Sequence, residues 1–306
     1  MKPFSKAILL FGLSVQCGAL FSETDNFTMS LPSQSCTGWD KNFNIVGDYH
    51  HIQDASIQHG KFRHHDFGFR EGKVLANGVY HFDKEKHLSL GIGYMNSHLD
   101  FDKRPHIRDS TFENLLVTAG TTVKSSDGWH WNGQLALQLN TDDISSRYCF
   151  FSGILEGKYE WKRRSNLHIG LIGVSGLRYT RVLPILGIDF KQSEQWKFNL
   201  IFPTNISAVY SFNHNFSLEA GLRTFLSRQR FSKHEEGRYE RGFIAYRNLG
   251  AELTFNYKIH ERLQASLQVG ETLGGRIRLS NKHDTQRRHL KLKPSPYVGL
   301  QACLAF

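Results

Sequence analysis

Apolar and polar residues alternate along most of this chain with a period of two. The clearest example is residues 129–140, WHWNGQLALQLN, where Trp, Gly and Leu occupy every second position. Side chains of a β-strand point alternately to two faces, so this pattern predicts a strand with one apolar face. The usual strand of a soluble protein has about 5–6 residues, whereas this segment fits a tilted membrane strand of about 9–11 residues.

Similar segments follow one another with little interruption, and they predict an all-β fold. We expect a single antiparallel up-and-down β-barrel that crosses a membrane with about fourteen strands. Short strands make 184–212 the weakest part of this prediction, and a hairpin outside the wall there would leave twelve. The expected strands are 42–52, 73–82, 87–101, 113–123, 129–141, 150–161, 166–175, 184–190, 196–202, 204–212, 216–227, 241–259, 262–277 and 296–306.

The connections between these strands differ in length and in composition. Four tight polar turns follow a Tyr-x-apolar sequence, at Tyr80, Tyr159, Tyr210 and Tyr257. Rings with one polar and one apolar end favour a membrane interface, so the repeat predicts an aromatic girdle on one side. The other connections are longer and more basic, an asymmetry typical of outer-membrane barrels. They are 53–72, 102–112, 142–149, 228–240 and 278–295.

The N-terminal residues have the pattern of an export signal. Lys2 and Lys6 precede an apolar stretch that is too short to span a bilayer, and small residues follow it. This arrangement predicts a secretory signal peptide over 1–22, cleaved after Ala19 or Ser22. A polar segment without a clear period, 23–41, is then a periplasmic lead-in, and 42–306 form the barrel.

The last strand alternates to the final residue, and its outer face is wholly apolar. Phe306 at the end of this strand resembles the assembly signal of Gram-negative outer-membrane barrels. The second half of the chain, from PILGIDF (184–190) to NLGAELTFNYKI (248–259), is similar to a family of outer-membrane barrels of unknown function. This resemblance covers residues 40–306. It implies an outer-membrane location and the barrel-assembly machinery as a partner, and no catalytic residues. The signal residues are Val298, Leu300, Leu304 and Phe306.

Charged residues also occur at positions that the alternation places inside the barrel. One hypothesis is a charged pore lining that sets ion preference. The other is mutual neutralisation, in which opposite charges pair and fill a narrow interior. Both signs are present, so both hypotheses stay open. The residues are Glu156, Lys158, Glu160, Glu219, Arg223, Glu252 and Lys258.

Composition adds little further chemistry. The chain carries a formal net charge of +10, and its basic loops suit contact with membrane lipid, including anionic lipopolysaccharide. We expect no nucleic-acid partner for an exported chain. Its 16 histidines include His50-His51, but neighbours on a strand face opposite ways, so we expect no metal site and no cofactor. Cys36 and Cys303 lie near the two ends that must pair on closure, and a disulfide between them is a hypothesis.

These observations favour a passive function. We expect a pore or channel for small solutes, or a structural barrel with basic surface loops. The first alternative is a surface adhesin or receptor that acts through its long loops. The second is an outer-membrane lipid-acting enzyme, although no G-x-S-x-G sequence is present. The third is a soluble secreted β-sandwich, in which a second sheet covers the apolar faces.

Overall fold

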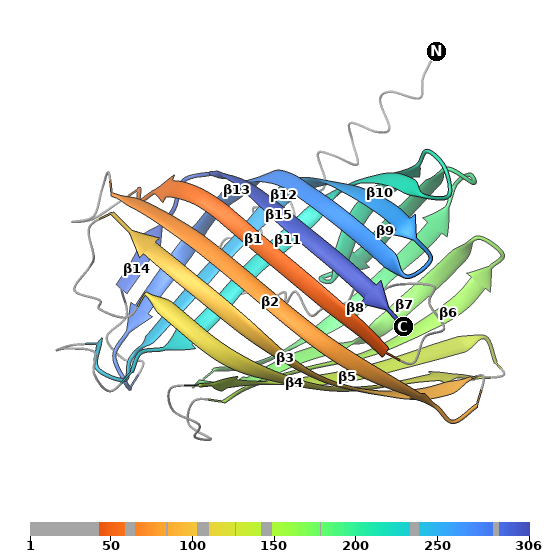
Figure 1. Cartoon of the computed structure of the whole chain (residues 1–306), viewed down its shortest axis with the longest axis horizontal. Coiled ribbons are helices and arrows are strands. Elements are labelled where there is room, and N and C mark those ends of the chain that lie inside the picture. Colours follow the sequence, from red (N-terminus) through yellow and green to blue (C-terminus); the bar gives the residue numbers. More distant parts are fainter. Residues whose placement is uncertain are drawn as a thin grey trace, which may run out of the picture.

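Fifteen strands of the computed structural model form one antiparallel sheet (Figure 1). The structure describes residues 43–58, 65–83, 85–102, 110–125, 127–141, 149–177, 179–232, 239–283 and 288–306. The strands are β1 (Phe43–Ser56), β2 (Asp66–His81), β3 (Lys86–Phe101), β4 (Thr111–Lys124), β5 (Trp129–Asn140), β6 (Phe150–Lys162), β7 (Ser165–Gly176), β8 (Tyr179–Lys191), β9 (Trp196–Phe202), β10 (Asn205–Ser211), β11 (Phe216–Arg230), β12 (Phe243–His260), β13 (Leu263–Ser280), β14 (Arg288–Lys291) and β15 (Pro296–Ala305).

The sheet closes on itself. Strands β1 to β13 pair in chain order, β13 pairs with β15, and β15 pairs with β1. The short strand β14 is added to β13 at the end of the barrel with the long connections. The closed wall therefore has fourteen strands, which are the fifteen without β14. The predicted fold and strand count are confirmed, and the weak stretch 184–212 belongs to the wall.

The middle of the barrel is apolar on its outside. Leu135 exposes 67% of its surface, and many other large apolar side chains project from the wall in the same way. All described strands lie in the one closed sheet, so no second sheet covers these side chains. The β-sandwich alternative is therefore wrong for the described part of the chain. Further outward-facing members of this apolar belt are Leu90, Ile92, Leu155, Val182, Leu186, Leu253 and Leu300.

Aromatic side chains surround the end of the barrel that carries the short turns. Tyr80 and Phe82 meet edge to face, with ring centroids 5.1 Å apart. The rings of Tyr210 and Phe212 are 4.8 Å apart, and Trp129 lies 5.1 Å from Tyr159. These contacts adjoin the tight turns at the right-hand end of Figure 1, where the C-terminus also lies. The girdle suits the boundary between hydrocarbon and headgroups.

The alternation reverses at the opposite end of the barrel. Phe67 and Phe69 of β2 are buried inside, where their rings lie 5.3 Å and 4.6 Å from the ring of Tyr246 on β12. The next outward side chain, Arg70, is exposed and lies 3.6 Å from the Asp100 carboxylate. Such an arrangement suits water outside and an apolar core within. The interior core contains Ile52, Ala55, Ile57, Phe67, Phe69, Leu99, Phe112, Phe225, Phe231, Tyr239, Ile244, Tyr246, Ile277, Leu279, Leu290, Leu292 and Tyr297.

This reversal corrects the predicted connection 53–72. Strand β1 continues to Ser56 and β2 already begins at Asp66. The sequence prediction ended these strands early because it expected apolar residues on the lipid side throughout. Residues 1–42 lie outside the described residues, so the signal peptide and the lead-in stay predictions.

Deletion of Phe306 should impair assembly strongly. The backbone N–H of Phe306 donates to the Phe43 carbonyl at 2.9 Å, and the two rings lie 5.9 Å apart, so this residue completes the joint between the first and last strands. Heat-modifiable gel mobility and outer-membrane fractionation measure the folded fraction. Deletion of Gly60, between β1 and β2, is the control. Normal assembly without Phe306 would contradict the prediction.

Candidate functional site in the barrel interior

A first cluster of charged side chains lies inside the wall on β1, β2, β11 and β12. The Asp48 carboxylate forms an ion pair with the Lys73 ammonium at 2.8 Å and lies 2.7 Å from Nε2 of His50. Arg223 donates from Nε to Glu252 at 2.7 Å. Its Nη1 lies 3.3 Å from His50 Nε2, which connects the two pairs across the interior. Positive and negative side chains of β1, β2, β11 and β12 therefore meet inside the barrel.

Tyr297 of β15 extends this cluster, and two glycines leave the space that its ring and the His50 ring occupy. Its hydroxyl donates to Oε2 of Glu252 at 2.9 Å, while Thr254 donates to the other carboxylate oxygen at 3.2 Å. A Cβ at Gly270 would lie 2.8 Å from the Tyr297 ring, and a Cβ at Gly299 would lie 2.5 Å from Nδ1 of His50. Glycine is required at both positions because interior side chains lie directly against the backbone.

A second cluster lies on β6, β7 and β8. His168 is buried between two carboxylates, with Nδ1 2.6 Å from Glu156 and Nε2 2.7 Å from Asp189. Asn166 donates to the other oxygen of Asp189 at 2.8 Å. Each carboxylate thus faces a ring nitrogen of the same imidazole, which satisfies buried charge in the way that a low-dielectric interior requires.

Apolar and amide side chains narrow the rest of the interior. Ile154, Ile172, Ile185 and Ile201 form a buried group on the same wall as the His168 cluster. Gln229 of β11 reaches Asn114 of β4 at 3.3 Å and thereby crosses the barrel. A cavity of about 80 Å³ remains beside Gln229.

The structure separates the predicted interior residues into three groups. Arg223 and Glu252 meet in the first cluster, and Glu156 belongs to the second. Lys158, Glu219 and Lys258 are half-buried on the alternate positions that face inward. Glu160 lies at the short-turn rim, where it pairs with His130 at 3.1 Å and is largely exposed.

Sequence reasoning missed the residues that complete both clusters. They occupy inward positions of the same alternation, so the period-two rule applied to every strand would have found them. Histidine was considered only as a metal ligand, and interior lysine and aspartate on the early strands were not considered. The missed residues are Asp48, His50, Lys73, His168, Asp189 and Tyr297.

The remaining predicted features concern the last strand and metal binding. Val298, Leu300 and Leu304 project outward from β15 and are exposed. Cys303 is buried and disulfide-bonded, whereas Cys36 lies outside the described residues. Within the described ranges, no group of three or more His, Cys, Asp or Glu side chains could hold a metal ion. No described helix is long and apolar enough to cross a membrane.

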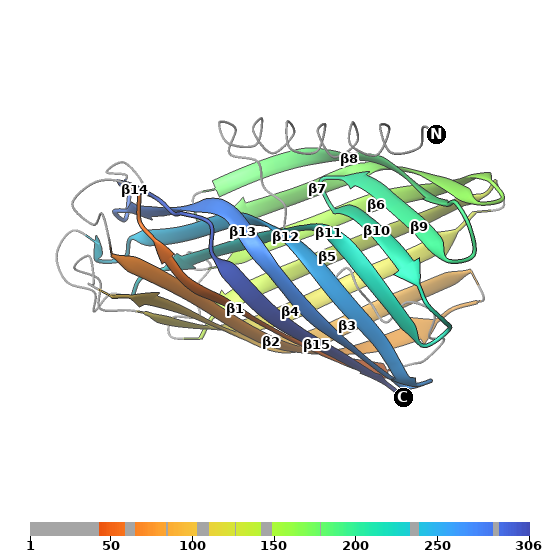
Figure 2. The same cartoon turned by 90° about the horizontal axis from the view of Figure 1, so that it is seen from above.

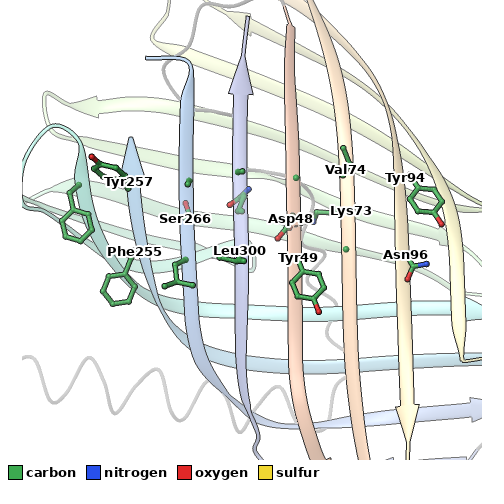
Figure 3. Close-up of a pocket in the computed structure, with 17 residues that line it drawn as sticks. Asp48, Tyr49, Lys73, Val74, Tyr94, Asn96, Phe255, Tyr257, Ser266 and Leu300 are labelled. Atoms are coloured by element: carbon green, nitrogen blue, oxygen red, sulfur yellow. Dashed lines mark ion pairs between the residues drawn. The ribbon is translucent and has the colours of Figure 1, made fainter. Parts of the chain in front are cut away.

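A depression beside the first cluster lies on the lipid side of the wall. It has a volume of about 830 Å³ and its accessible lining is mostly apolar. Figure 3 shows side chains that line it from several neighbouring strands, among them Tyr49 of β1, Tyr94 of β3, Phe255 of β12 and Leu300 of β15. These four side chains are exposed and point outward, so the depression is a saddle in the apolar belt.

An exposed apolar outer face is stable in the hydrocarbon core of a bilayer, and a closed sheet leaves no unpaired backbone edge there. The molecule is therefore a β-barrel of the outer-membrane class. The chain belongs to the family described as Domain of unknown function (DUF6268), which matches residues 84–301.

Three proteins illustrate what this chain is similar to in sequence or in fold. An uncharacterized protein of Chlamydia pneumoniae is 22% identical over 280 residues, which cover 86% of this chain and 87% of the relative. The COG4313 outer membrane channel from Pseudomonas putida F1 has a similar fold, with a TM-score of 0.51 and 10% identity over 87% of this chain and 96% of the channel. The toluene transporter TodX of Pseudomonas putida gives a TM-score of 0.42 and 10% identity over 90% and 92%.

Replacement of His168 by Ala should destabilise the barrel strongly. It leaves Glu156 and Asp189 facing each other without their shared partner, and the loss of one member of a buried charged group costs about 3–5 kcal/mol. His130→Ala is the matched control, since its pair with Glu160 is exposed and worth about 0–1 kcal/mol. Urea unfolding in lipid vesicles measures both, and equal effects would contradict the prediction.

A disulfide between Cys36 and Cys303 stays a prediction that peptide mapping tests. Alkylation with and without reductant should yield one linked peptide that contains both residues. Free thiols at both positions, or a link from Cys303 to a different cysteine, would contradict it.

Proposed function

We propose that this barrel is a passive channel for small solutes in the outer membrane. The observation that carries the proposal is the half-buried charge of both signs inside a wall of fourteen strands. About eight strands enclose only enough space for side chains, and about 16–18 leave an aqueous channel. A fourteen-stranded wall lies between these limits, so its interior holds both packed clusters and hydrated charges.

An apolar core fills part of the interior at the long-connection end. Rings from strands that are not neighbours meet there: Phe67 of β2 contacts Tyr246 of β12, and Phe112 of β4 contacts Phe231 at the end of β11. A solute that moves along the barrel axis therefore has to pass this apolar core. On the short-turn side, Lys158, Glu219 and Lys258 supply a lining with mixed charge, which favours modest ion preference over strict selection.

Lipid and assembly partners follow from the same proposal. Lys282, Lys291 and Lys293 are exposed at the long-connection end and suit contact with lipopolysaccharide phosphates. The outward apolar row of β15 suits recognition by the barrel-assembly machinery. Arg228, which the sequence placed in a basic loop, is instead buried on β11. The adhesin alternative depends mainly on connections outside the described residues. The charged side chains of the two clusters pair with one another, and we propose no catalytic role for them.

Conductance across a planar bilayer tests the proposal. The purified full chain should give discrete current steps, and Glu219→Gln should shift the reversal potential toward anions because an interior negative charge is lost. Glu261→Gln is the control, because Glu261 lies exposed in the turn between β12 and β13. No current at any voltage would overturn the channel proposal.

A further inference from the structure

The hairpin of β9 and β10 is much shorter than the strands beside it. Each of its strands has 7 residues, whereas β8 has 13 and β11 has 15. Figure 2 shows β9 and β10 ending while β8 and β11 continue toward the long-connection end. The barrel wall is therefore lower at this hairpin than at the strands on either side of it.

Two strand edges are left without a neighbour above the hairpin. The β8–β9 ladder ends at the pair Leu186 and Phe202, and the β10–β11 ladder begins at the pair Ile206 and Leu222. Residues 179–185 of β8 and 223–230 of β11 have no ladder on these edges. An open sheet edge in hydrocarbon is costly because each unpaired backbone group lacks a water partner.

Overlap of the two edges closes this gap. Leu226 of β11 and Phe243 of β12 belong to the outer face of their strands, since Gln229, on the opposite face of β11, reaches Asn114 across the interior. Both nevertheless pack against Phe150 and Val174, which are buried on the inner face of β6 and β7. The ends of β11 and β12 thus lie inside the wall formed by β6, β7 and β8.

The Arg228 guanidinium makes polar contacts across this overlap. Arg228 of β11 donates to the Leu177 carbonyl from Nε at 3.2 Å and from Nη2 at 2.7 Å. Leu177 lies in the turn between β7 and β8 and belongs to the same apolar group as Phe243. Between β8 and β11, the Arg228 guanidinium and apolar packing thus replace the backbone ladder that joins consecutive strands of the ring.

The overlap has apolar surfaces on both sides. On the lipid side, Val182 of β8 exposes 63% of its surface and Leu186 exposes 56%. On the interior side, Leu183 packs against the groups that contain Val174 and Ile185. A polar solute that enters here would lose its hydration without gaining hydrogen bonds, which is costly. An apolar solute has no such hydrogen bonds to lose and would avoid this cost. Separation of the overlap breaks no strand ladder.

We propose that the overlap between β8 and β11 is a lateral portal through which small apolar solutes pass between the barrel interior and the bilayer. This inference rests on the channel function proposed above and names the substrate class. The solute meets the isoleucine group of β6 to β9 and need not cross the apolar core at the long-connection end. The portal and the axial path are separable, because they use different parts of the wall.

A reversible crosslink tests the portal. Leu183→Cys/Leu226→Cys on a Cys149→Ala background is treated with a short bifunctional methanethiosulfonate reagent. Uptake of the apolar dye N-phenylnaphthylamine is then measured in porin-deficient Gram-negative cells that express the full chain. Crosslinking should reduce dye uptake to the level of cells without the protein, and reductant should restore it. The control is Ala208→Cys/Ala220→Cys, a pair already joined by the β10–β11 ladder, which should leave uptake unchanged.

A second variant acts in the opposite direction. Arg228→Met removes both hydrogen bonds to Leu177. Hydrogen bonds from a charged donor each stabilise the closed overlap substantially, so their loss should raise dye uptake about tenfold. Three results would overturn the portal: no crosslink at 183 and 226, unchanged uptake after a verified crosslink, or no uptake by the unmodified protein. In each case, current steps in the planar bilayer would leave the axial channel standing. Loss of current with dye uptake intact would remove the axial channel alone.

Discussion

Backbone pairing in a medium without water is the constraint on which this structure depends. A strand in hydrocarbon needs a partner on both edges, and a closed sheet alone gives every strand two neighbours. The joint between β1 and β15 meets this need, with β15 in turn paired to β13. The requirement explains why the final residues alternate to the end and why Phe306 still bonds to Phe43. Closure also creates an interior, whose contents then have to be satisfied.

The interior is filled according to the solvent outside it. Within the bilayer the outer face is apolar, so the polar face of each strand turns inward, where its charges pair with each other. Beyond the bilayer the outer face meets water, and the apolar residues turn inward to form the core around Tyr246. One rule of alternation thus produces a polar interior at one height and an apolar interior at another.

The wall departs from full pairing above the short hairpin. Shortening β9 and β10 leaves two edges that the protein covers by overlap and by the Arg228 guanidinium. Such a joint is mechanically different from the rest of the barrel, because it can separate without the loss of a ladder. The proposed portal depends on this difference, and its solute path runs through the wall of the barrel and not along the barrel axis.

Local pattern determined most of the fold. Period-two alternation identified the fourteen strands, the lipid-facing side of each, and the girdle at the tight turns, because each of these depends on residues adjacent in sequence. It also placed Arg223, Glu252 and Glu156 on the polar face of their strands. Tertiary structure alone decided which side chains meet across the barrel, such as Arg223 with His50, Phe67 with Tyr246, and Leu226 with the inner face of β6 and β7. Alternation specifies the face of a strand, but partners across a closed barrel depend on the stagger, height and curvature of every strand in the ring.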